Sequence, residues 1–122
     1  MPHRPIPVNG TGKLLTDLTS DNGAPSAITD GFQLSGDTHL LLAFGSSVAF
    51  GSYHAKVFFM DPASNDWALD TQYGTAGNIT ISRATKLQFA MNRFYSRVYV
   101  EVFTFSGGMK ASVCALQSDV TS

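Results

Sequence analysis

The stretch that decides the fold reads Tyr53-His-Ala-Lys-Val-Phe-Phe-Met-Asp-Pro-Ala-Ser-Asn-Asp-Trp-Ala-Leu69. Apolar residues recur at every second position from Tyr53 to Phe59, and this period of two predicts a strand with one buried face. Asp61-Pro62 and Ser64-Asn65-Asp66 are typical turn residues, because proline presets φ and short polar side chains bond their own backbone. Trp67 begins a second strand. The stretch therefore predicts a central β-hairpin.

The rest of the sequence repeats this pattern of short apolar stretches between turn residues. No window of 11 or more residues keeps a helical stripe, so the chain is predicted to be all-β. The spacing favours a single antiparallel β-sandwich, jelly-roll-like, with about eight strands. The expected strands are residues 31–35, 38–44, 53–60, 67–72, 78–82, 86–91, 96–105 and 109–117.

The N-terminal 30 residues have a different composition. Pro2, Pro5 and Pro7 remove backbone donors and favour extended conformations. We therefore divide the chain into an extended Pro/Gly-rich arm, residues 1–30, and a β-sandwich domain, residues 31–122. A short strand or a helical turn over 13–18 and a disordered tail are the alternatives for parts of this arm.

Composition limits the classes of function. Charged residues make up 14% of the 122 residues and the net charge is −1, which argues against a nucleic-acid binder with a basic stripe. The longest apolar stretch, 40–44, is far shorter than the roughly 18 residues of a membrane span. The single cysteine, Cys114, excludes an internal disulfide framework and fits synthesis in a reducing cytoplasm. The N-terminus lacks the apolar region of a signal peptide.

Two strand pairings follow if neighbouring strands form hairpins. Gly107-Gly108 as a two-residue turn places Val102 opposite Val113 and Val100 opposite Ala115. The shared face of these valines and alanines is then the core face. In the same way, the 45–52 loop pairs strand 38–44 with strand 53–60, with His39 opposite Phe58.

The opposite face of strand 96–105 combines large aromatic side chains with a few charges. A solvated face is usually more polar than this one. Part of it is therefore covered by the other sheet, by a loop or by another subunit, since exposed aromatic patches often mark interfaces. The members of this face are Arg97, Tyr99, Glu101, Phe103 and Phe105, with Lys110, Ser112, Cys114 and Leu116 expected opposite.

Motifs for chemistry are weak in this sequence. The segment 9–13 lacks two required positions of a phosphate loop, no G-x-S-x-G element is present, and no Cys/His cluster has zinc spacing. Most carboxylates fall in predicted turns, where they serve turn geometry rather than acid–base chemistry. We therefore expect no catalytic residues, no metal and no cofactor.

One aromatic pair offers a binding alternative. Trp67 and Tyr73 are the kind of residues that line sugar-binding faces. The competing interpretation, which we favour, is that Trp67 fills the core beside the turn at 61–66, because apolar residues follow it.

The chain from about residue 40 to residue 120 resembles small β-sandwich virion proteins of tailed bacteriophages, the capsid decoration or cement proteins. The resemblance rests on the Tyr53–Phe59 strand, the polar turn before Trp67-x-Leu69, Asn78-Ile-Thr-Ile81, the strand Arg97-Val-Tyr-Val-Glu-Val and the Gly107-Gly108 turn.

This resemblance implies a non-enzymatic protein, made in the host cytoplasm, that binds the outer surface of a virion and staples neighbouring major capsid subunits. It also implies a homo-oligomer, dimer or trimer, with no nucleic-acid or membrane partner. We expect the arm and the aromatic face to make these contacts, through Pro5, Ile6, Pro7, Val8, Arg97, Tyr99, Phe103 and Phe105. The alternative is a recognition module, such as a carbohydrate-binding or tail or receptor-binding β-sandwich.

Overall fold

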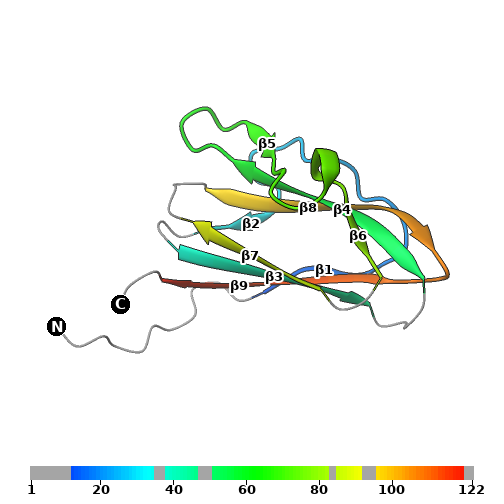
Figure 1. The fold of residues 1–122 in the computed structure, drawn as a ribbon. Helices are drawn as coiled ribbons and strands as arrows, with labels where there is room; N and C mark the ends of the chain where they lie inside the picture. Colours follow the sequence, from blue (N-terminus) through cyan, green and yellow to red (C-terminus); the bar gives the residue numbers. More distant parts are fainter. Residues whose placement is uncertain (1–11, 35–37, 47–50, 83–84, 92–95, 120–122) are drawn as a thin grey trace, which may run out of the picture.

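A computed structural model describes residues 12–34, 38–46, 51–82, 85–91 and 96–119. These residues form an all-β fold of two antiparallel sheets, which lie one above the other in Figure 1. The strands are β1 (Gly12–Leu18), β2 (Phe32–Gln33), β3 (Thr38–Ser46), β4 (Ser52–Met60), β5 (Trp67–Leu69), β6 (Ile79–Ile81), β7 (Thr85–Met91), β8 (Arg97–Ser106) and β9 (Ala111–Asp119), with one 3₁₀ turn η1 (Thr75–Gly77). The predicted all-β sandwich is confirmed.

The strand order is jelly-roll-like. One sheet has the order β1-β9-β3-β7, and the other has the order β2-β8-β4-β5, with β6 also paired to β4. The chain changes sheet at every step except from β4 through β5 to β6. Without the short β5, eight strands make two four-stranded sheets, as in a jelly roll.

The hairpin predicted from Tyr53 to Leu69 is confirmed. β4 pairs with β5 in antiparallel register, with Phe59 opposite Ala68 and Met60 opposite Trp67. The turn between them carries Asn65 at a φ of 60°, a left-handed conformation that asparagine tolerates better than most residues. β4 also pairs with β8 on its other side, so it lies in the middle of its sheet.

Two predicted pairings were wrong. β8 and β9 lie in different sheets, and so do β3 and β4. β9 pairs instead with β1 and β3, so the residues opposite Cys114 are Lys13 and Ala43 rather than Glu101. Gly107-Gly108, both with positive φ, therefore carries the chain from one sheet to the other and does not close a hairpin.

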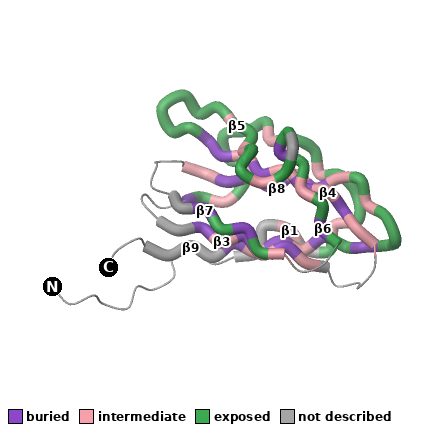
Figure 2. The backbone as a smooth tube through the Cα atoms, viewed as in Figure 1, coloured by how far each residue is buried: buried purple, intermediate pink, exposed green. Residues whose placement is uncertain are grey.

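The predicted core face is nevertheless right. Val98, Val100 and Val102 are buried on β8, and Ala111, Val113 and Ala115 are buried on β9, but they face one another across the sandwich. Figure 2 shows the buried residues on the inner sides of the two sheets. Alternation fixes which side of a strand is apolar, whereas it does not say which strand lies next to it.

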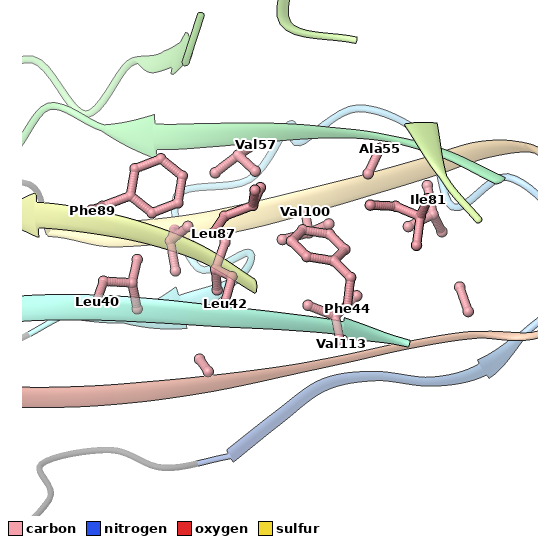
Figure 3. Close-up of a cluster of buried hydrophobic side chains, with 14 of the residues drawn as sticks. Leu40, Leu42, Phe44, Ala55, Val57, Ile81, Leu87, Phe89, Val100 and Val113 are labelled. Carbon is pink, nitrogen blue, oxygen red and sulfur yellow. The ribbon is translucent and has the colours of Figure 1, made fainter. Parts of the chain in front are cut away.

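The core between the sheets is aromatic and aliphatic (Figure 3). Phe89 of β7 meets Phe59 of β4 edge to face across the sandwich, at 5.2 Å between ring centroids. Phe44 and Leu42 of β3 are almost completely buried in the same cluster. Burying side chains of this size contributes about 1.5–3 kcal/mol each, so this cluster holds the two sheets together.

The described part of the predicted arm belongs to the fold. Residues 12–18 form β1, which pairs with β9 through two register irregularities, and Leu15 and Leu18 pack against the core. Residues 19–31, which we call the strap, then cross from the first sheet to the second. Figure 1 shows the strap leaving β1 and passing to the far side of β8 and β4 before it reaches β2.

Candidate functional site

The aromatic face of β8, on which a contact surface is predicted, is shared in the structure with β4. The register places Met60, Phe58, Lys56 and His54 of β4 opposite Arg97, Tyr99, Glu101 and Phe103 of β8, respectively. All eight side chains lie on the side away from the core, because their neighbours in each strand are the buried ones. Tyr99 contacts Phe58 edge to face at 6.4 Å between ring centroids.

Arg97 fastens the strap to this face. Its guanidinium donates from Nε to the carbonyl of Asp30 at 2.6 Å, and from Nη2 to the carbonyls of Thr29 and Gly31 at 3.1 and 3.0 Å. A planar fork of donors suits three neighbouring acceptors better than a single ammonium group does. The end of the strap therefore has its carbonyls satisfied by one side chain of β8.

The approach of the strap to β8 is close. Gly31 has a φ of 78°, and a side chain at this position would collide with the carbonyl oxygen of Val98. Glycine is the residue that meets both requirements, since it has no Cβ and adopts positive φ without strain. The strap thus enters β2 in contact with the backbone of β8.

Aromatic side chains hold the middle of the strap. The Tyr99 hydroxyl donates to the carbonyl of Gly23 at 2.8 Å, and the Trp67 indole N–H donates to the carbonyl of Ala27 at 3.1 Å. The two rings contact each other edge to face at 6.0 Å. Trp67 is half-buried on the outer face and does not belong to the core cluster, so the expectation that it fills the core was wrong.

The burial of Met60 shows how completely this end is covered. Met60 has only 2% of its surface exposed, although the alternation of β4 puts it on the outer face and it is not part of the core cluster. Its cross-strand neighbours are Trp67 and Arg97, the two side chains that bind the strap. This end of the aromatic face is therefore an interior surface of the protein.

The start of the strap covers the edge of β8. The Asn22 amide accepts from the N–H of Val102 at 2.8 Å and donates to the carbonyl of Val100 at 3.0 Å. The Asp21 carboxylate accepts from the N–H of Thr104 at 3.3 Å. These side chains take the place of a neighbouring strand where the two-residue β2 leaves β8 unpaired. The sequence predicts only that these residues belong to the extended arm, and this role was missed.

Asp30 shapes the turn at the end of the strap. Its Oδ2 accepts from the backbone N–H groups of Ser26 and Ala27, each at 2.9 Å. These hydrogen bonds, chiefly that from Ser26, hold the pKa of Asp30 below its usual value, and Arg97 adds to the effect. Because the folded pKa is lowered, the carboxylate stabilises the turn above the ordinary pKa, and this contribution disappears as the pH falls below it.

The other end of the outer face has no such cover among the described residues. Phe103 is half-buried, with the His54 ring edge-on at 5.6 Å and Lys56 Nζ 5.3 Å from its ring centroid. The side chains of Lys56 and His54 thus contact the Phe103 ring and cover part of it. A cation over an aromatic ring contributes about 0.5–1 kcal/mol at exposed sites, so Phe103 is partly occupied within its own sheet.

Phe105 lies on the other side of the sheet from its predicted position. Thr104 has a φ of 54°, and the β4–β8 register shifts between Ser52 and His54. This bulge turns Phe105 inward, where it stacks on Tyr53 with ring centroids 5.5 Å apart and packs against the core. Strict alternation predicts Phe105 beside Phe103, and a bulge reverses that direction.

The structure separates the predicted site residues into three groups. Arg97 and Tyr99 come together under the strap, Phe103 lies at the open end of the same face, and Phe105 packs against the core. The arm residues Pro5, Ile6, Pro7 and Val8 lie outside the described residues.

The proposed sugar-binding pair is also divided. Tyr73 packs against Phe89 at 5.4 Å between ring centroids, and its hydroxyl donates to the carbonyl of Gln88 and accepts from the N–H of the same residue. The Tyr73 hydroxyl therefore hydrogen-bonds the outer edge of β7, which belongs to the opposite sheet from Trp67. The two aromatics do not form one platform.

No group of three or more His, Cys, Asp or Glu side chains in the described ranges is arranged to hold a metal ion. Cys114, the one cysteine, is half-buried on β9. Within the same ranges no helix has the length and hydropathy of a membrane span. Comparison with known proteins finds no matching family model, no matching curated protein and no matching solved structure.

Proposed function

We propose that the protein is a non-enzymatic structural protein of a virion, which binds the outer surface of a capsid and staples neighbouring major capsid subunits. The observation that supports this most is the jelly-roll-like strand order of the four-stranded and the five-stranded sheet. Jelly rolls of this kind are used in viral capsid and lectin domains. The support is a likeness of fold, joined to the resemblance in sequence described above.

The stapling role fits a protein with a rigid sandwich and many weak contacts. Each copy needs only modest affinity, because a lattice of identical subunits offers many equivalent sites and multivalent contacts add together. Self-association as a dimer or trimer would match the symmetry axes of a shell. Sedimentation analysis of the purified protein measures its oligomeric state and so tests self-association separately.

The contacts of Trp67 weigh against the alternative, a carbohydrate-recognition module. Its indole N–H is engaged with Ala27 and its ring with Tyr99, so these groups are not free to form a stacking platform for a sugar. Glycan binding that is lost in Trp67→Ala, with the fold retained by circular dichroism, would favour the recognition module instead.

The direct test mixes the purified protein with undecorated shells and measures the thermal unfolding of the shells. A ligand that binds the folded state alone stabilises it by RT ln(1 + [L]/Kd), so saturation should raise the melting temperature of the shell. An unrelated β-sandwich of similar size and charge is the control. The absence of binding together with an unchanged melting temperature would refute the proposal.

A further inference from the structure

The charges of this protein are distributed unevenly. The strap, 19–31, and the segment 61–70 together hold five of the nine acidic residues and no Lys, Arg or His. All eight Lys and Arg residues share the remaining chain with the other four acidic residues. The acidic residues of the two segments are Asp21, Asp30, Asp61, Asp66 and Asp70.

These two segments form one surface. The hydrogen bond from Trp67 to the carbonyl of Ala27 joins the strap to the β4–β5 hairpin. Figure 2 shows the hairpin loop as a continuous exposed stretch at the top of the sandwich. We call residues 19–31 and 61–70 the strap–hairpin surface. Arg97 lies against the strap with its guanidinium on backbone carbonyls, and the two segments themselves hold five carboxylates.

The same surface carries exposed apolar side chains. Ile28 is 60% exposed and Leu69 is 37% exposed, and no other large hydrophobic residue of the described ranges is classed as exposed. Ile28 follows Ala27 in the strap, and Leu69 follows Trp67 by two residues in β5, so both lie near the contact that joins the two segments. Exposed apolar side chains bordered by polar residues are found at protein-binding sites.

The outer edge of β5 is open to a further strand. Asp61 donates to the carbonyl of Asp66, and Asp70 donates to the carbonyl of Val57, so these pairs are hydrogen-bonded across the hairpin. In an antiparallel ladder the alternate residues point their N–H and C=O groups the other way. Trp67 and Leu69 therefore present theirs to the outer edge of β5, which is the end strand of its sheet and pairs with β4 on its other side.

Other edges of the sandwich are closed by side chains. Asn22 takes the place of a strand beside β8, and the Tyr73 hydroxyl binds both the N–H and the carbonyl of Gln88 on β7. Proteins cover strand edges because free edges recruit other chains. The edge of β5 is thus exceptional among these three, and it borders the exposed Leu69.

We propose that the strap–hairpin surface binds a basic segment of a partner protein, which adds to β5 as an extended strand. Backbone hydrogen bonds to Trp67 and Leu69 would fix its register, and alternate apolar side chains would rest on Leu69 and Ile28. Lysine or arginine at the flanking positions would meet Asp61, Asp66 and Asp70. This inference does not depend on whether the partner belongs to a capsid.

The test uses nitrogen-15 NMR of the intact protein with a blocked lysine–valine–lysine–valine–lysine peptide as the probe. The Trp67 indole N–H gives a single resonance, because the chain has one tryptophan. The basic peptide should shift this resonance and the amides of Leu69 and Ile28. The same peptide with glutamate in place of lysine should not shift them, and 0.5 M salt should weaken the response to the basic peptide.

Two kinds of variant separate charge from strand addition. Asp61→Asn with Asp66→Asn keeps side-chain acceptors and should weaken peptide binding about fivefold, whereas the control Glu101→Gln removes a charge outside the surface and should not. Leu69→Pro removes one outward N–H at a position where an edge strand tolerates proline, and should abolish binding. Leu69→Thr keeps that N–H and should retain part of the binding.

Several outcomes would overturn the inference. Equal shifts from the basic and acidic peptides would show that binding does not depend on charge complementarity. Shifts centred on residues outside 19–31 and 61–70 would assign the contact to another surface. Unchanged binding by Leu69→Pro, with a native spectrum, would rule out strand addition. The shell-melting experiment measures a different property, so failure of one proposal does not decide the other.

Discussion

Arg97 binds three successive backbone carbonyls of the strap with one guanidinium group. Sequence analysis proposed Arg97 and Tyr99 as partner contacts because both lie on an aromatic outer face. Their polar groups instead bind the strap, a segment more than 65 positions earlier in the chain. A strand pattern reports the direction of a side chain, and it carries no information about a distant loop that covers it. Phe103, at the other end of this face, contacts Lys56 and His54 within its own sheet.

Replacing Arg97 tests its role as the fastening of the strap. Arg97→Ala should lower the free energy of unfolding by about 1–3 kcal/mol, because hydrogen bonds from a charged donor are lost at a partly exposed site. Arg97→Lys should recover only part of this loss, since an ammonium group does not provide the same fork of donors. Chemical denaturation measures both. Equal stabilities of Arg97→Ala and the natural protein would contradict the account.

Tyr53 gives the fold a dependence on alkaline pH. Burial raises the pKa of Tyr53 to about 12, while its hydroxyl donates to the carbonyl of Gly45 at 2.9 Å. A phenol in the unfolded chain titrates near 10, so the contribution is present below pH 10 and disappears as the pH rises toward 12. Tyr53→Phe should be less stable by about 1 kcal/mol near neutral pH. This difference should shrink above pH 10, as followed by denaturation at several pH values. A difference in stability that stays constant up to pH 12 would show that burial does not raise the pKa of Tyr53.

At the scale of elements, the strap is the part that sequence analysis treated least well. The strands after residue 31 were foreseen because period-two patterns are local, whereas β1 was foreseen only as one alternative for residues 13–18. The β4–β5 hairpin was foreseen because its turn residues are local. The strap has no period, and its contacts come from Asn22, Asp30 and Gly31 meeting β8 far along the chain. The bulge at Thr104 was also missed. A positive φ is usually predicted from a glycine, and here the residue with positive φ is a threonine.

Asn22 tests whether the strap closes the edge of β8. Asn22→Ala should destabilise the protein by about 1–3 kcal/mol, because the N–H of Val102 and the carbonyl of Val100 lose their partners near a buried strand. Hydrogen exchange at the Val102 amide should accelerate more than at amides of β9. Asn78→Ala, at an exposed position before β6, is the matched control and should change neither quantity. Unaltered exchange at Val102 would show that the amide of Asn22 does not protect this edge.

In the whole molecule, the sequence predicts which face of each strand is apolar. It does not predict which strands pair with one another. Adjacent strands in sequence were expected to pair, yet the chain changes sheet between β3 and β4 and again between β8 and β9. Both arrangements bury the same valines and alanines, so hydrophobic patterning alone does not choose between them. In this arrangement the strap covers one end of the outer β4–β8 face, through its contacts with Trp67, Arg97 and Tyr99.

The measurement that bears most directly on the proposed function is whether the protein co-purifies with a large particle, and in what ratio to the main subunit of that particle. The account predicts a particle-bound fraction with a fixed ratio of copies to the major subunit, retained through gradient sedimentation. Protein found only free in solution, or in the particle fraction at a ratio that varies between preparations, would contradict it.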